Sequence, residues 1–120
     1  LHLSIRRQRQ MCIRDSLHTH RHETIAKAWD AGVPIYAGTD AGGTIKHGLI
    51  ASEVRLLVAV GGAEMALGAA SWRARAWLGG EQLGIGDSAD LLVLDRDPRV
   101  DVGVLESPTY IVLRGRVVIR

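Results

Sequence analysis

The sequence predicts an α/β protein, and three observations support that fold class. Apolar residues recur at helical spacing over residues 21–31, and Gly32 follows as a typical helix end. A short apolar run at residues 33–37 comes next, and its partly β-branched composition is typical of a buried strand. Residues 81–120 then change character and contain short strand-like runs. A helix, a tight glycine turn and a buried strand in succession indicate an α/β layer.

The first predicted helix has one apolar face and one charged pair. Ile25, Ala28 and Trp29 share a face at i, i+3, i+4 spacing. Glu23 and Lys27 stand four residues apart, so their side chains can pair on the helix surface. This helix would lead directly into the strand at residues 33–37.

Two more helices are expected between residues 49 and 78. The first covers about residues 49–60, and the glycine pair at 61–62 ends it. Its apolar face consists of Ile50, Val54 and Leu57. The second covers about residues 63–78, and its alanine-rich stripe predicts close approach to a neighbouring element. The stripe contains Ala63, Ala66, Leu67, Ala70, Ala74 and Trp77.

The last part of the chain predicts a very small sheet. A strand is expected at residues 91–94, a turn at Asp97-Pro98, and a hairpin over residues 109–119 that bends near Arg114-Gly115. Three short strands need a partner to be stable. We therefore expect this chain to be the tail of a larger protein.

Residues 1–16 have a different origin in our interpretation. Their sequence can be encoded in order by the codons of a string that resembles a transposase-type sequencing adapter, with residues 3–5 in its barcode position. A basic arm for nucleic acid and an Arg-rich transit peptide are the alternatives. We expect residues 1–16 to be non-native, and such a segment is excluded from fold reasoning.

This exclusion changes the charge balance. Without residues 1–16, Lys+Arg falls from 15 to 11 and Asp+Glu from 13 to 12, so the net charge changes from +2 to −1. The only cysteine, Cys12, is also lost. A nucleic-acid binder would rest on the arginines of residues 6–14 alone, and two Tyr and three Trp are few for a stacking surface. No apolar run approaches the roughly 20 residues that span a bilayer. We therefore expect neither nucleic acid nor a membrane as a partner.

Asp40 is the strongest candidate for chemistry. It follows the apolar run at 33–37, and in parallel α/β folds the carboxyl ends of strands carry catalytic residues. Gly38, Gly42 and Gly43 leave room around its carboxylate and let a ligand approach the backbone. The alternative is that Asp40 only caps a turn.

Four blocks of sequence, in order, resemble the carboxyl-terminal part of the metal-dependent amidohydrolase superfamily, in its imidazolonepropionase-like and dipeptidase-like branch. They are "GVPIYAGTDAGG" with a following "KHG", "EMALGAASWRARAWLGG", "LGIGDSADLLVLDRDP" and "YIVLRGRVV". The resemblance implies a carboxyl-terminal fragment of a (β/α)8 TIM-like barrel plus returning strands of a small β-sandwich. Residues 33–38 would be the last barrel strand, residues 17–80 the last part of the barrel, and residues 81–120 the sandwich strands.

The resemblance also implies a reaction. The parent protein would hydrolyse a C–N bond of a cyclic amide or small peptide, using water activated by one or two divalent metal ions, with zinc expected. Asp40 matches the family's aspartate that contacts the metal and moves the proton of the attacking water. His47 lies in the "HG" that the family often keeps after this aspartate, so it is a candidate for binding substrate or ordering the loop, and the alternative is a plain helix-start residue. The fragment itself would be inactive, because the family's other ligands should precede residue 21.

The remaining polar residues have structural interpretations. His18 and His20 imitate a His-x-His pair, but they directly precede a helix, where that motif cannot lie. A structural role is also expected for Thr39, Glu53, Asp90, Asp95, Asp97, Arg114 and Arg116.

The function hypothesis is therefore a piece of a cytoplasmic amidohydrolase, whose parent could form a homo-oligomer. The alternative is a non-catalytic α/β interaction module that binds a partner through exposed helix faces. An upstream His-x-His motif would separate the two.

Overall fold

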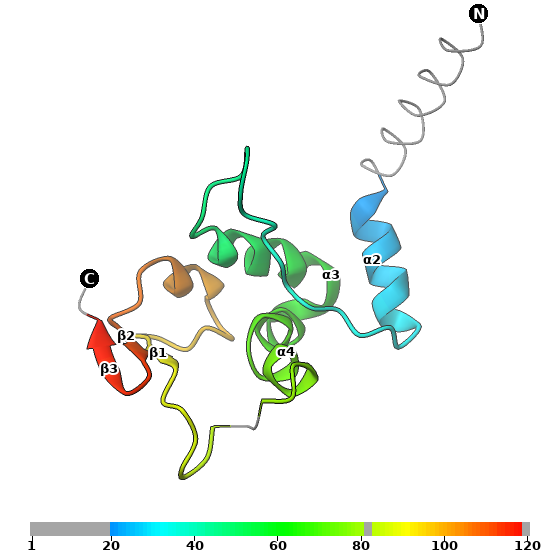
Figure 1. Cartoon of the computed structure of the whole chain (residues 1–120). Helices are drawn as coiled ribbons and strands as arrows, with labels where there is room; N and C mark the ends of the chain where they lie inside the picture. The colour runs from blue at the N-terminus through cyan, green and yellow to red at the C-terminus, as the bar shows by residue number, and fades with distance from the viewer. Residues whose placement is uncertain (1–19, 81–82, 119–120) are drawn as a thin grey trace, which may run out of the picture. The chain divides into compact units, whose positions relative to one another are not determined.

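The computed structural model describes residues 20–80 and 83–118 (Figure 1). The chain divides into two units, residues 1–34 and residues 35–120. Each unit is described separately below. The predictions for residues 1–16 and for His18 lie outside the described residues.

Helix α2 (Arg21–Asp30) is the described element of the first unit and confirms the predicted helix at residues 21–31. Nζ of Lys27 lies 2.6 Å from Oε1 of Glu23, as the spacing of the two residues predicts. His20 precedes the helix, and its Nδ1 lies 3.4 Å from Oε2 of Glu23. His20 is therefore a helix-start residue, as expected.

The end of α2 shows why Gly32 follows it. Gly32 has a φ of 80°, and its N–H donates to the carbonyl of Trp29 at 2.9 Å. The N–H of Val33 donates to the carbonyl of Ala28, also at 2.9 Å. This pair of hydrogen bonds is the Schellman arrangement, which satisfies the last helix carbonyls and needs a left-handed residue at the glycine position.

The predicted strand at residues 33–38 is wrong. These residues have no strand partner among the described residues, and Val33 is exposed. Within the second unit, the N–H of Ala37 donates to the carbonyl of Ala69 at 3.0 Å, and the Tyr36 ring stacks on Trp77 with 4.9 Å between centroids. An apolar run becomes a strand only when a neighbour accepts and donates its backbone hydrogen bonds. Here the run packs on helices instead.

Two helices form the centre of the second unit. Helix α3 (Ile50–Ala70) contains a kink at Gly61 and Gly62, where the backbone is not helical and Gly62 has a φ of 81°. This kink confirms the predicted break. The second predicted helix, residues 63–78, is interrupted at Ser71, and α4 (Trp72–Trp77) follows. The sequence did not predict the interruption at Ser71, because neither this residue nor its two neighbours is a glycine or a proline.

The core of the second unit lies mainly on α3. Its buried apolar residues are Ala51, Val54, Leu57, Met65, Ala66, Leu67, Ala69 and, from η1 (Val102–Glu106), Val104. Four of the residues predicted to face inward are among them: Val54, Leu57, Ala66 and Leu67. Trp77, predicted on the same stripe, is 67% exposed because α4 turns away after Ser71.

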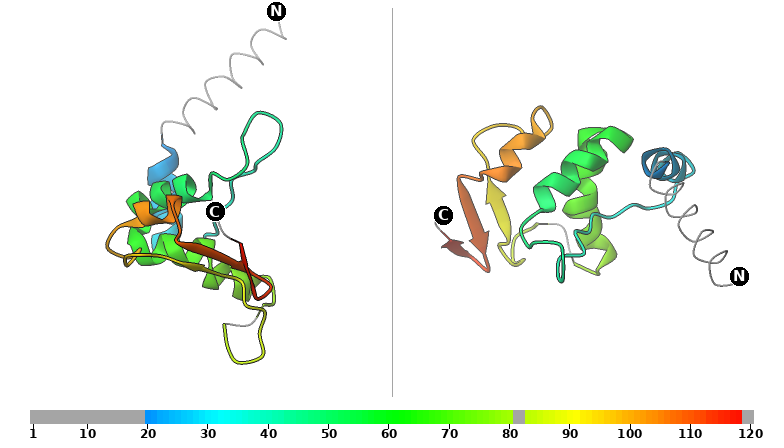
Figure 2. Two further views of the ribbon diagram at one scale, coloured as in Figure 1. Left: turned by 90° about the vertical axis from the view of Figure 1, so that its left-hand side faces the viewer. Right: turned by 90° about the horizontal axis from the view of Figure 1, so that it is seen from above.

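Three short strands form one antiparallel sheet. Strand β1 (Leu91–Val93) pairs with β2 (Tyr110–Leu113), and β2 pairs with β3 (Arg116–Val118), in the order β1-β2-β3. The turn between β2 and β3 has positive φ at Arg114 (49°) and Gly115 (74°), as a two-residue type I′ hairpin requires. The predicted strand and hairpin are confirmed. In Figures 1 and 2 the sheet lies on one side of α3 and α4.

The expected (β/α)8 barrel fragment with sandwich strands is wrong as a fold class. The described residues form three α-helices and a three-stranded sheet in which both strand pairs are antiparallel. A barrel of alternating strands and helices is built from strands that pair in parallel, and neither of the two strand pairs in the described residues is parallel. The expectation failed at residues 33–38, since the barrel assignment depended on a strand there.

None of the described helices is long and apolar enough to cross a membrane.

Candidate functional site

Asp40 lies in a loop whose backbone is left-handed at several positions. Asp40 itself has a φ of 47°, a conformation that aspartate adopts more readily than most non-glycine residues. Gly42, Gly43 and Gly48 also have positive φ. Such conformations cluster at ligand sites and turns, where surrounding structure maintains them. The loop therefore presents the Asp40 side chain in a fixed backbone conformation.

The glycines around Asp40 have two different roles. A Cβ placed on Gly38 would lie 3.7 Å from Oδ1 of Asp40, so Gly38 does border the carboxylate. A Cβ on Gly42 or Gly43 would meet nothing within 4 Å. These two glycines are required for their positive φ and not for space. Of the three glycines predicted to make room around Asp40, Gly38 is thus the one whose Cβ would contact the carboxylate.

A tight turn closes the loop beyond Asp40. The N–H of Gly42 donates to the carbonyl of Ile45 at 3.0 Å, and the N–H of Ile45 donates back at 3.2 Å. These two hydrogen bonds fix residues 42–45 as a small hairpin-like turn. The turn gives the loop local order without any side-chain contact from Asp40.

The Asp40 carboxylate is exposed and makes no hydrogen bond or ion pair with any residue in the described part of the chain. Asp90 and Asp97, by contrast, are engaged in internal hydrogen bonds. A carboxylate that the fold itself does not use is available for a ligand. Asp40 no longer follows a strand, however, so the strand-end argument for a catalytic role does not apply.

His47 is exposed and lies in the turn that precedes α3. Across residues 20–80 and 83–118, no hydrogen bond or ion pair joins it to Asp40. The two predicted site residues thus share one loop, residues 39–48, without a hydrogen bond or ion pair between them in the described part of the chain.

The described residues alone do not make a metal site. They contain no cluster of three or more His, Cys, Asp or Glu side chains that could hold an ion. A catalytic zinc needs three protein ligands in addition to water. The donor set therefore does not fit a complete metal centre, and Asp40 could supply at most one ligand of such a centre.

Asp90 has a structural role, as expected. Its Oδ1 accepts the backbone N–H of Arg114 at 2.7 Å, and its Oδ2 accepts the hydroxyl of Ser88 at 2.9 Å. These hydrogen bonds, that from Arg114 foremost, hold the pKa of Asp90 below its ordinary value. Nη2 of Arg75, on α4, lies 3.9 Å from Oδ2 of Asp90. Asp90 therefore ties the hairpin turn to the segment before β1.

Asp97 also has a structural role, and the turn predicted at Asp97-Pro98 is confirmed. Its Oδ2 accepts from Nη2 of Arg99 at 2.6 Å, and its Oδ1 accepts from the Arg99 backbone N–H at 2.8 Å. The Arg99 side chain, and then its backbone N–H, lower the pKa of Asp97 to about 2. The carboxylate is thus committed to a local turn.

An Arg99→Gln substitution should raise the pKa of Asp97 towards the ordinary value of about 3.9. Because the pKa of Asp97 is lowered in the unaltered protein, the contact with Arg99 stabilises the turn at pH values above the ordinary pKa of an aspartate. Its contribution is lost as the pH falls towards about 2. A carboxyl titration followed by NMR measures the pKa. Arg96→Gln is the control, because Arg96 pairs with Asp95 and Asp101 instead. An unaltered protein with an Asp97 pKa near 3.9 would contradict the prediction.

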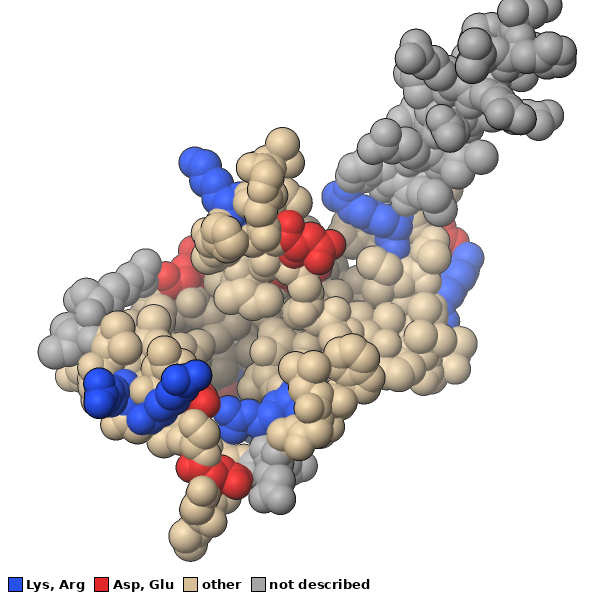
Figure 3. All heavy atoms as spheres, in the orientation of Figure 1, with Lys and Arg blue, Asp and Glu red and all other residues tan. Residues whose placement is uncertain are grey.

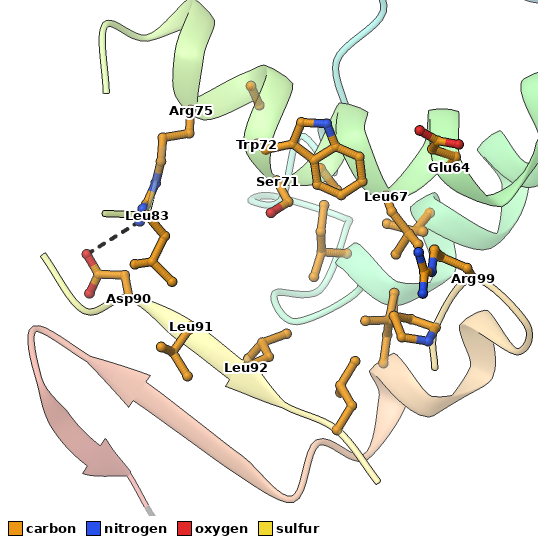
Figure 4. Close-up of a pocket in the computed structure, with 18 of the residues that line it drawn as sticks. Glu64, Leu67, Ser71, Trp72, Arg75, Leu83, Asp90, Leu91, Leu92 and Arg99 are labelled. Carbon is orange, nitrogen blue, oxygen red and sulfur yellow. Dashed lines mark ion pairs between the residues drawn. The ribbon is translucent and has the colours of Figure 1, made fainter. Parts of the chain in front are cut away.

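A broad groove lies elsewhere in the second unit, and the sequence did not predict it. It has a volume of about 1200 Å³ and lies between α3, α4 and strand β1 (Figure 4). Leu67 and Trp72 line it from the helices, and Leu91 and Leu92 line it from β1. Neither Asp40 nor His47 is among its lining residues. The periodicity of the sequence predicts which apolar residues share a helix face, but it does not predict which of these faces other elements leave exposed.

No protein-family model matches the chain. Over 101 residues it is 52% identical to uncharacterized proteins of Mycobacterium bovis and of two Mycobacterium tuberculosis strains, a match that covers 83% of this chain and 27% of each relative. A solved crystal structure of an uncharacterized protein is 30% identical and has a TM-score of 0.72. This match covers 82% of the present chain and 26% of the solved one. The chain thus spans about a quarter of the length of these relatives.

Proposed function

We propose that this chain is part of a metal-dependent hydrolase that cleaves a C–N bond in a small cyclic amide or a small peptide. The observation that carries the proposal is the exposed Asp40 carboxylate, which lies in a glycine-rich loop at a φ of 47° and has no polar partner among the described residues. The four sequence blocks that resemble amidohydrolases support the same reaction class.

Asp40 is the proton-transfer group in this proposal. A carboxylate can accept the proton of an attacking water and then give it to the leaving amine. The exposed position of Asp40 allows a substrate to approach it, and Gly38 leaves one side of its carboxylate free of a side chain. A bound divalent metal would supply hydroxide near neutral pH. Because the described residues do not complete a metal site, the further ligands would come from the rest of the longer protein.

His47 is the proposed substrate-binding residue. It is exposed, and it lies in the same loop as Asp40. An imidazole offers one donor and one acceptor when neutral, which suits the amide group of a cyclic amide or a dipeptide. We place the longer protein in the cytoplasm. We also propose that it can form a homo-oligomer.

The alternative is a non-catalytic interaction module, and the open groove between α3, α4 and β1 favours it. A module of that kind would need no metal and no proton-transfer group. The two functions therefore differ in whether metal-dependent amine release can be measured.

The full-length protein should release amine from a panel of dipeptides and cyclic amides after it is loaded with zinc. Removal of the metal with a chelator should abolish the release, and zinc should restore it, because the metal activates the water. Amine detection by a fluorogenic reagent measures the rate. Metal-independent binding of a protein partner without any amine release would favour the interaction module instead.

A further inference from the structure

Most of the residues that line the groove in the second unit are apolar, and the described residues leave the groove open. Leu67 and Trp72 stand on the helix side, and Leu83, Leu91 and Leu92 stand opposite (Figure 4). Trp72 is 41% exposed, Leu83 56% and Leu92 48%. Burial of apolar surface is favourable by roughly 25 cal/mol per Å². The groove has a volume of about 1200 Å³. An apolar group that covered its lining would bury this exposed apolar surface and so stabilise the protein.

Five charged residues line the groove, and all of them except Glu64 form ion pairs with one another. Arg75 and Asp90 form an ion pair of 3.9 Å, drawn as a dashed line in Figure 4. Arg99 and Asp97 form another, with Nη2 and Oδ2 at 2.6 Å. On the face in Figure 3, the blue and red side chains occur in small groups of both signs. Glu64 is then the one charged lining residue outside these two pairs, so the groove offers no cluster of like charges to a charged ligand, and its chemistry fits an apolar occupant.

Strand β1 gives the occupant a further attachment. The strand order β1-β2-β3 leaves one edge of β1 without a partner among the described strands. Leu91 and Leu92 are consecutive, so they belong to opposite faces of the sheet, yet both line the groove. The groove therefore reaches the free edge of β1, where unpaired backbone groups can accept another segment.

We propose that an apolar segment of the same polypeptide covers this groove, and that the segment belongs to the part of the longer protein outside the region represented here. The match to the mycobacterial relatives takes up only 27% of their length, so roughly three quarters of each relative lies outside the matched region. An intramolecular segment also needs no second molecule to be ordered on binding, which lowers the entropic cost of covering the groove. The proposal does not depend on the hydrolase function.

Cysteine labelling in the full-length protein tests the proposal. Leu92→Cys places a thiol in the groove, and Val100→Cys places the control thiol at a residue that is 87% exposed and does not line the groove. Each labelling rate is divided by the rate of the same variant in denaturant, and mass spectrometry identifies the labelled site. We expect the Leu92 position to be protected by roughly tenfold or more. The Val100 position should be labelled at nearly its unfolded rate.

Two results would overturn the proposal. The first is labelling of the Leu92 position as fast as that of the Val100 position, since the groove would then be open in the longer protein. The second is protection that disappears on dilution, because a second copy would then be the occupant. If Leu92→Cys prevents folding, hydrogen exchange of the β1 amides that point away from β2, in the unsubstituted full-length protein, replaces it. Fast exchange of these amides would have the same meaning as fast labelling.

Discussion

An Asp40→Asn substitution in the full-length protein is expected to lower the turnover number for C–N hydrolysis by roughly 10²–10⁴-fold, the usual contribution of a positioned acid–base group. Asparagine keeps the size and shape of aspartate but cannot accept the proton of the attacking water. The Michaelis constant should change far less, because the lost interaction belongs mainly to the transition state. Initial rates of amine release over a range of substrate concentrations separate the two constants.

Two controls make the Asp40 result specific. Metal content must be measured in each variant, since loss of a metal ligand would imitate loss of a base. Asp30→Asn is the matched substitution, because Asp30 is an exposed aspartate at the end of α2 with no assigned role. A variant of Asp40 with full metal content and near-normal turnover would leave Asp40 as a turn residue only.

Residues 17–120 alone should fail to show a cooperative two-state unfolding transition as a monomer. The buried apolar residues of the second unit are few and come mainly from α3. Many large apolar residues are exposed instead, including Leu78 at 75% and Trp77 at 67%. Exposed apolar surface of this extent promotes association.

Thermal unfolding followed by circular dichroism, together with sedimentation, tests this expectation. We predict a broad transition and concentration-dependent association. A sharp transition from a monomer would show that the piece folds alone. That result would favour the independent interaction module over a hydrolase fragment. The same preparation should release no amine from the substrates of the full-length protein.

Local patterns in the sequence predicted the local structure well. The i, i+4 spacing of Glu23 and Lys27 predicted their ion pair, because helix geometry alone brings such side chains together. The Gly61-Gly62 kink and the hairpin at Arg114-Gly115 were also predictable, since both depend on backbone conformations that glycine favours. These features need no information about the rest of the fold.

Features that depend on distant residues were not predictable. Residues 33–37 have the composition of a buried strand, but a strand also needs a pairing neighbour, and composition does not supply one. The break at Ser71 and the open groove likewise depend on how the helices and the sheet pack. For the candidate site, the sequence identified Asp40 and its glycine-rich loop. It did not indicate that, among the described residues, the Asp40 carboxylate and His47 form no hydrogen bond or ion pair with each other.

The most direct test of the role of Asp40 is a crystal structure of the full-length protein grown with zinc, with anomalous scattering recorded at the zinc absorption edge. We predict an anomalous peak with a carboxylate oxygen of Asp40 at a ligand distance of roughly 2 Å or one water away, and with histidines from the remainder of the protein around it. An Asp40 side chain surrounded only by bulk solvent, with no zinc peak near it, would contradict the proposed hydrolase site.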